Sequence, residues 1–201
     1  MSTKKTALVA TTLAMALTAS VFASTPANAA PAPTIPNQVA LKMKDVKRYG
    51  ADTVFDLGVT TTGTVTFAGQ FCDTFDNGAT GLEPLPSLSR WWSWYDADNG
   101  LDVSIEQVVT VWDDPAGALV DVQNDTGYCR VFPGDTYTVV ESDDDSWAAQ
   151  FGTYAVAVER VNGSLVAITV YDWNNRIDEM TEAQRLLDIA VPKAARSPKL
   201  P

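Results

Sequence analysis

The chain has 201 residues, a formal net charge of -11, two cysteines and no histidine. The lack of histidine excludes a Ser-His-Asp triad, a Cys-His dyad and a histidine-ligated metal site. The acidic balance argues against nucleic acid and anionic lipid as partners, because both carry negative charge.

The first residues are typical of a secretory signal peptide. Lys4 and Lys5 precede an apolar run from Ala7 to Ala23, and Ala27-Asn28-Ala29 fits a small-x-small cleavage pattern. An uncleaved membrane anchor is the alternative, but the Ala- and Thr-rich run is a poor span. We therefore expect a secreted, extracellular protein that is not embedded in a membrane.

The expected domain organisation follows from this leader and from the length that remains. About 170 residues are left after cleavage, which suits one domain. The boundaries we predict are a signal peptide at 1-29, an extended linker at 30-36, a single globular domain at 37-195 and a flexible tail at 196-201.

Cys72 and Cys129 are the only cysteines, and export places them in an oxidising compartment. An even pair in that setting predicts one disulfide. Two free thiols or a thiolate metal site are the alternatives, but no paired CxxC motif of the structural zinc type is present.

Hydrophobic periodicity predicts the elements of the first half. A helix capped by Asn37 comes first, followed by a Thr-rich strand over Val59–Ala68 and a turn-rich surface loop that Cys72 holds at one end and that reaches Pro86. A hairpin then pairs Arg90–Tyr95 with Val103–Trp112, and Asp114 and Pro115 begin a helix that ends near Gly127.

The second half reads as strands followed by a helix. Thr136–Glu141 is a short strand, and Tyr154–Arg160 and Ser164–Trp173 form a hairpin around Asn162-Gly163. The second arm is apolar on both faces, which marks a central strand covered on both sides. Asp178 to Ala195 is an amphipathic helix.

This order predicts an α+β fold. We expect a single antiparallel β-sheet of about five to six strands, with amphipathic helices packed on one face and one disulfide.

Aromatic residues supply the sharpest candidate site. On the first hairpin strand, Trp92 and Trp94 point one way and Trp91 and Tyr95 the other, so they cannot all enter one core. The alternative to a binding surface is core and loop packing. The candidate ligand-binding residues, which line a sugar-type or apolar platform beside the Cys72–Pro86 loop, are Trp91, Trp92, Trp94, Tyr95 and Trp147.

Carboxylates are the other candidates. A glycosidase-type pair can be sought among residues near turns or strand ends, namely Asp96, Asp102, Asp172 and Asp178. The run Asp96–Asp102 fails the EF-hand pattern, because its glycine comes one position early. Asp143–Asp145 with Glu141 can bind calcium weakly, although a solvated turn explains it as well. We predict no catalytic residue, no metal and no cofactor.

Two runs resemble a known family. Val108–Ala118, leading to Cys129, and Val156–Ile168, followed by a closing helix, resemble the actinobacterial sensor-domain family that includes the extracellular domain of PknH-type receptor kinases. The resemblance implies an antiparallel sheet with packed helices, a cleft for an unknown small ligand and no catalysis.

Three function hypotheses follow. The first is a secreted, non-catalytic, monomeric sensor-type domain that binds a small molecule or a cell-envelope component. The second is an exported inhibitor or interaction module that presents its loop or its acidic face to another protein. The third is a histidine-free hydrolase.

Overall fold

The computed structural model describes residues 35–46, 49, 53–62, 87–96, 98, 100–124 and 137–197, with only the backbone described for 53–62 and Ser87. These residues belong to one compact unit, Ala32–Pro201. The predicted signal peptide, Cys72, Cys129, the loop that ends at Pro86 and the last four residues lie outside the described residues. Their predictions therefore stay predictions.

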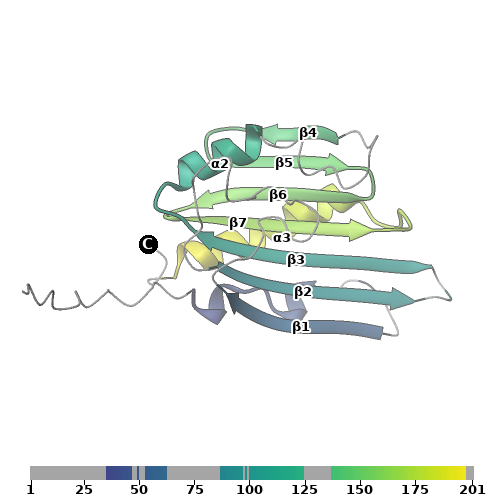
Figure 1. Cartoon of the computed structure of the whole chain (residues 1–201). Helices are drawn as coiled ribbons and strands as arrows, with labels where there is room; N and C mark the ends of the chain where they lie inside the picture. Colours follow the sequence, from purple (N-terminus) through teal and green to yellow (C-terminus); the bar gives the residue numbers. More distant parts are fainter. Residues whose placement is uncertain are drawn as a thin grey trace, which may run out of the picture. The chain divides into compact units, whose positions relative to one another are not determined.

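A seven-stranded antiparallel sheet forms the centre of this unit (Figure 1). Its strand order is β1-β2-β3-β7-β6-β5-β4. The strands are β1 (Thr53–Thr62), β2 (Ser87–Asp96), β3 (Leu101–Val111), β4 (Tyr137–Ser142), β5 (Ser146–Phe151), β6 (Tyr154–Val161) and β7 (Ser164–Asp172). Hairpins join the neighbours β2 and β3, β4 and β5, and β6 and β7, which explains the antiparallel pairing.

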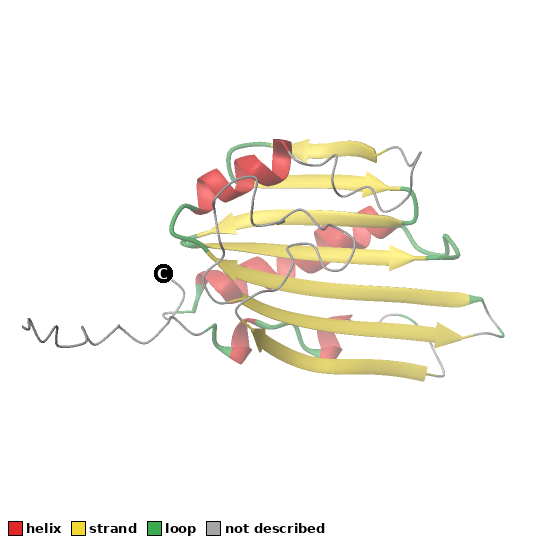
Figure 2. Ribbon diagram, in the orientation of Figure 1, coloured by secondary structure: helices red, strands yellow, loops and turns green. Residues whose placement is uncertain are grey.

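Helices cover both faces of the sheet (Figure 2). They are the 3₁₀ turn η1 (Asn37–Val39) and the helices α1 (Met43–Val46), α2 (Pro115–Asn124) and α3 (Glu179–Ala195). The helix α3 lies on one face with η1 and α1, whereas α2 lies on the other.

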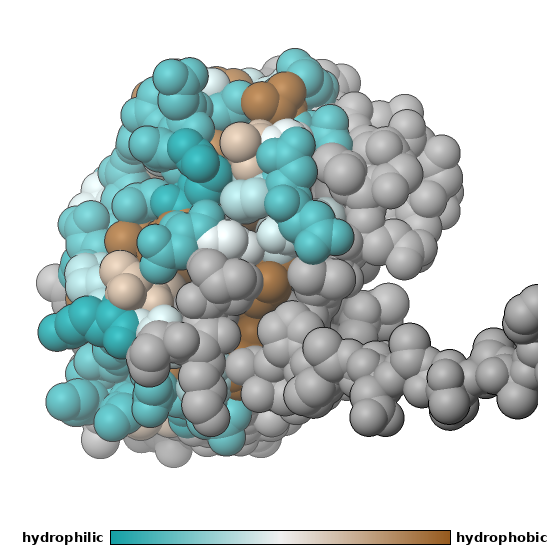
Figure 3. Space-filling model, turned by 90° about the vertical axis from the view of Figure 1, so that its left-hand side faces the viewer, coloured by the Kyte–Doolittle hydropathy of each residue, from teal (hydrophilic) through white to brown (hydrophobic). Residues whose placement is uncertain are grey.

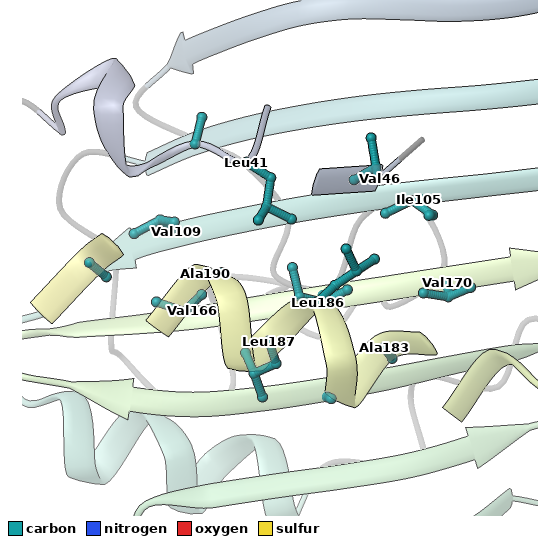
Figure 4. Close-up of a cluster of buried hydrophobic side chains, with 14 of the residues drawn as sticks. Leu41, Val46, Ile105, Val109, Val166, Val170, Ala183, Leu186, Leu187 and Ala190 are labelled. Atoms are coloured by element: carbon teal, nitrogen blue, oxygen red, sulfur yellow. The ribbon is translucent and has the colours of Figure 1, made fainter. Parts of the chain in front are cut away.

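The larger core lies under α3 (Figure 4). Leu186 and Ala190 of α3 are fully buried against alternate residues of the central strands, such as Ile105 and Val166. Leu41, from the segment after η1, joins the same cluster. Each fully buried aliphatic side chain of this kind contributes about 1.5–3 kcal/mol of hydrophobic free energy.

A second core lies under α2. Leu119 and Val122 of α2 pack with Trp147 and with Val156 and Val158 of β6. Because Ala155 and Ala157 of the same strand enter the α3 core, β6 is buried on both faces.

The predicted α+β class and single antiparallel sheet are confirmed, but two details differ. The sheet has seven strands, and α2 packs on the face opposite α3, so the helices do not share one face. The continuous burial of β7 explains the difference, since an apolar strand needs cover on both sides. The prediction that this strand is covered on both sides is therefore confirmed, whereas the prediction that all helices pack on one face is wrong.

Two strands depart from their predicted places. The strand predicted from Val59 begins six residues earlier, as β1, because the strand continues through Gly58, where the register shifts between Asp56 and Val59. The strand β5 was not predicted, because its sequence contains Ala148 and Ala149, a residue type depleted in strands. Burial on both faces of a sheet overrides that propensity.

Local signals placed the β6–β7 turn and the starts of α2 and α3 correctly, but the cap predicted at Asn37 is wrong, because Asn37 lies inside η1 and no side-chain hydrogen bond caps that turn. Asn162 has a positive φ of 54° in the two-residue turn between β6 and β7. At the start of α2, Gly117 donates its N–H to the Asp114 carboxylate at 2.9 Å. A Cβ on Gly117 would lie 2.5 Å from an oxygen of that carboxylate, so a larger residue there would displace the capping side chain. Asp178 caps α3 by accepting from the N–H of Thr181.

Hydrophilic side chains cover most of the described surface on the side that Figure 3 shows, and hydrophobic residues form small patches there. None of the helices in the described part of the chain has the length and apolarity that a membrane span requires.

Candidate functional site

The tryptophans of β2 divide between the two faces of the sheet, as the alternation predicts. Trp92 and Trp94 are 0% exposed and belong to the α3 core, where Tyr49 meets the Trp94 ring edge-on at 5.6 Å. Trp91 is half-buried on the opposite face, and Tyr95 is 50% exposed there.

Burial removes three of the five candidate ligand-binding residues from any open surface. Trp92 and Trp94 fill the α3 core, and Trp147, at 1% exposure, lies in the α2 core beside Phe151. A side chain that fills a core offers little surface to a ligand, so the candidate site is built without these three. Trp91 and Tyr95 remain candidates.

Tyr95 belongs to a row of residues that crosses three strands. Asp102 at the start of β3 pairs with Tyr95. Trp173, the residue after β7, donates its N–H to the Asp102 carbonyl oxygen at 3.2 Å. Tyr95 and Trp173 therefore flank Asp102, and each is 50% exposed. We call this set the Tyr95–Asp102–Trp173 row; it lies where the ends of β2 and β7 meet the start of β3 (Figure 1).

The spacing within this row follows from the geometry of the sheet. Neighbouring strands lie about 4.8 Å apart, so the Cα atoms of Tyr95 and Trp173 are about 10 Å apart with Asp102 between them. The row is a carboxylate with one large, half-exposed aromatic side chain on each side.

Two further rows continue the pattern along the same face. Ser93 and Tyr171 flank Ser104, whose hydroxyl donates to that of Ser93 at 3.3 Å. Trp91 and Thr169 flank Glu106 in the next row. The polar side chains of β3 thus form a central column between β2 and β7.

Both carboxyl groups of that column are held partly out of water. Burial raises the pKa of Glu106, and the hydrogen bond from the Ser89 hydroxyl at 2.9 Å opposes this effect. Burial also raises the pKa of Asp102, and the nearby Asp172 carboxylate raises it further. The column therefore carries negative charge that is costly to keep ionised.

Trp173 also ends a series of neighbouring aromatic rings. It meets Tyr171 edge-on, with ring centroids 4.4 Å apart, and Tyr171 stacks on Tyr154 at 6.0 Å. Tyr154 in turn stacks on Phe151 at 4.8 Å. This packing supports the exposed Trp173 from one side, which limits the conformational entropy lost when a ligand binds.

Sequence reasoning missed Trp173 as a site residue. The available signal was its position two residues after Tyr171, which assigns both to one face of β7. The half-exposure that makes Trp173 a candidate depends on the end of β7 and could not be read from the pattern.

Two of the four carboxylates considered for a glycosidase pair, Asp172 and Asp178, hold local backbone N–H groups. The Asp172 carboxylate accepts from the N–H groups of Asn174 at 3.0 Å, Ile177 at 2.8 Å and Arg176. Asp178 caps α3, and Asp96 is buried at 5% exposure. Among the described residues, no group of three or more acidic or cysteine side chains has the arrangement of a metal site.

A separate acidic pocket lies between β4, β5, β6 and α3. It has a volume of about 250 Å³, and its lining includes Glu141, Glu159, Gln184 and Asp188. Burial raises the pKa of Glu159, and the neighbouring carboxylates add to the shift. The pocket is a negatively charged hollow next to the edge strand β4.

Comparisons with known proteins add little to this geometry. No protein-family model matches the chain, and no curated protein matches it significantly. A similar solved structure is the extracellular domain of PknH from Mycobacterium tuberculosis, which is 11% identical and covers 78% of this chain and 97% of its own. The TM-score is 0.46.

Proposed function

We propose that the chain is an exported, non-catalytic ligand-binding domain of the sensor type, whose site is the Tyr95–Asp102–Trp173 row. The observation that carries this proposal is the pair of 50% exposed aromatic side chains on either side of a partly buried carboxylate. The ligand is a small molecule or a component of the cell envelope.

Physical chemistry favours binding over packing as the reason for this arrangement. The half-exposed Trp173 and Tyr95 leave large apolar surfaces in contact with water. Trp92 and Trp94, on the same strand as Tyr95, are fully buried. Aromatic surface that converges with a polar group is the usual composition of a small-molecule site.

The sensor-type part of the proposal rests on the sequence motifs. The runs that resemble the sensor-domain family, Val108–Ala118 and Val156–Ile168, cover the end of β3, the start of α2 and most of the β6–β7 hairpin; Asp102 and Trp173 lie outside them on the same strands or next to them. A non-catalytic role fits the structural use of Asp172 and Asp178, whose carboxylates cap local N–H groups.

Calorimetric titration of the full chain against separated envelope fractions (glycans, peptidoglycan fragments and lipids) tests the proposal. One fraction should release or absorb heat saturably, and Trp173→Ala and Tyr95→Ala should each weaken that binding about tenfold or more. Val140→Ala is the matched control, because Val140 is 51% exposed on the distant edge strand β4. The absence of heat with every fraction, or an equal loss in the control, would contradict the proposal.

A second candidate function is interaction with a basic protein segment at the edge strand β4. Val139 and Val140 are 46% and 51% exposed there, next to the acidic pocket that contains Glu141 and Glu159. An edge strand can add an extended partner through backbone hydrogen bonds. Recovery of one stoichiometric exported partner by the full chain, and its loss with Val140→Lys, would favour this function instead.

A further inference from the structure

We infer that the Tyr95–Asp102–Trp173 row binds a ligand through an ammonium group that sits between the two aromatic side chains, against the Asp102 carboxylate. This inference rests on the proposed function, because it assigns a ligand class to the same site.

The first step concerns the residue types. Aromatic rings attract cations through the negative potential of their faces, and Trp and Tyr are the strongest of them. A carboxylate between two such side chains adds a full negative charge to the same place. Tyr95, Asp102 and Trp173 combine both sources of attraction in one row across the sheet.

The second step concerns the charge around the row. The buried Asp172 carboxylate lies on the other face of the sheet and is held by backbone N–H groups. The negative charge of the row is therefore that of Asp102, with Glu106 two rows further along the same face of β3. A neutral sugar would leave this negative charge uncompensated. An ammonium group would neutralise it, and the net charge of -11 would draw a cation toward the chain.

The third step concerns size and access. With their Cα atoms about 10 Å apart on one face of the sheet, the two aromatic side chains can both contact one group the size of a trimethylammonium. The half-exposure of Tyr95 and Trp173 keeps this space open to solvent at the end of the sheet. A ligand can therefore insert its ammonium group while the rest of the molecule stays outside.

Amide chemical shifts of the ¹⁵N-labelled full chain, recorded during titration at constant ionic strength, test the inference. The probes are choline and its neutral isostere 3,3-dimethyl-1-butanol, with propylammonium as a primary amine and glucosamine and N-acetylglucosamine as a charged and a neutral sugar. Choline should shift the amides of the row saturably. The neutral isostere should bind at least about tenfold more weakly than choline. The amine and sugar arms show whether the preferred source is a quaternary ammonium, a primary amine or an amino sugar.

Matched variants separate specific recognition from the general attraction of an acidic protein. Asp102→Asn should weaken choline binding about tenfold while leaving the neutral isostere unchanged, and Trp173→Ala should weaken both. Glu141→Gln removes one charge at the acidic pocket and should leave choline binding unchanged. Equal losses in Asp102→Asn and Glu141→Gln would overturn the inference.

Failure of the ligand class is distinguishable from failure of the site. Equal affinity for choline and its neutral isostere, or binding of neutral N-acetylglucosamine alone, would reject the ammonium group and keep the row as a binding site. Envelope binding that is insensitive to Trp173→Ala would reject the site itself.

Discussion

Trp91 and Trp92 are neighbours in the chain but have opposite environments. Trp92 is 0% exposed in the α3 core, and the Arg90 guanidinium lies 5.0 Å from the centre of its ring. Trp91 is half-buried on the other face, opposite Glu106. The same Trp-to-Ala substitution at these two positions therefore compares the two faces of the sheet directly.

Trp92→Ala should lower the free energy of unfolding by about 3–5 kcal/mol, because it removes a large buried side chain and leaves a cavity. Trp91→Ala should cost clearly less, since Trp91 is partly solvated. Urea unfolding monitored by circular dichroism checks both, and Trp92→Phe keeps a folded chain available if Trp92→Ala does not fold. Equal losses from the two Ala variants would contradict the assignment of faces.

Single residues of the site were predictable where alternation applied, and not elsewhere. The period of two assigned Trp91 and Tyr95 to one face and Trp92 and Trp94 to the other. The burial of Trp147 in the α2 core could not be foreseen, because β5 had not been predicted. The pairing of Tyr95 with Asp102, and of Asp102 with Trp173, depends on tertiary register that one sequence does not reveal.

Gln107 of β3 links the N-terminal segment to the sheet through two hydrogen bonds. This side chain is fully buried, accepts from the N–H of Leu41 at 2.6 Å and donates to the carbonyl oxygen of Val39 at 3.3 Å. Its signal in the sequence was a polar residue at a position of β3 whose neighbours two residues away, Ile105 and Val109, face the α3 core.

Gln107→Leu should destabilise the chain by about 2–3 kcal/mol, because the buried N–H of Leu41 and the carbonyl group of Val39 would lose this hydrogen-bond partner. Hydrogen exchange of the Leu41 amide should accelerate, and urea unfolding should give the free-energy loss. Gln123→Leu is the control: Gln123 donates to the carbonyl oxygen of Asp143 at an exposed site, so its loss should stay below about 1 kcal/mol.

The acidic pocket between β4, β5, β6 and α3 should make stability depend on pH. Burial first, and then repulsion from carboxylates of those elements and of the β4–β5 turn, raises the pKa of Glu159 above its ordinary value of 4.5; these carboxylates are Asp188, Glu141, Asp143 and Asp145. Because the folded pKa is the higher one, the native state favours protonated Glu159. That contribution is complete below the unfolded pKa and is lost as the pH rises through the folded pKa.

Glu159→Gln should therefore raise the Tm by about 1–2 °C at neutral pH, a size typical of one partly exposed charge, and should leave it unchanged well below the ordinary pKa. Thermal unfolding across a pH series measures this difference. Asp144→Asn removes the same formal charge from an exposed turn position and should raise the Tm less. A gain that is independent of pH would rule out the titration of Glu159 as its cause.

Elements were predictable where local signals were strong. Asp114 with Pro115, Asp178 and Asn162-Gly163 marked their helix starts and turn correctly. The first helix proved to be two short elements, η1 and α1, held by burial and by Gln107. The start of β1 was predicted too late and β5 was not predicted, because a glycine inside a strand and alanines within a sheet both contradict average propensities.

The disulfide predicted between Cys72 and Cys129 lies outside the described residues and remains a prediction. Non-reducing peptide mass spectrometry of the exported protein should recover the two cysteines as one linked pair. Reduction should then lower the free energy of unfolding by about 2–4 kcal/mol. Two free thiols in the exported protein would contradict the export-based inference from the sequence.

One measurement separates the two surfaces of this molecule most directly. Amide chemical shifts of the ¹⁵N-labelled full chain, followed during titration with the envelope fraction that binds, should change at Tyr95, Asp102 and Trp173. The amides of Glu141, Glu159 and Asp188 around the acidic pocket should stay in place. Changes confined to the acidic pocket, or an unchanged spectrum with every fraction, would contradict a ligand site at the Tyr95–Asp102–Trp173 row.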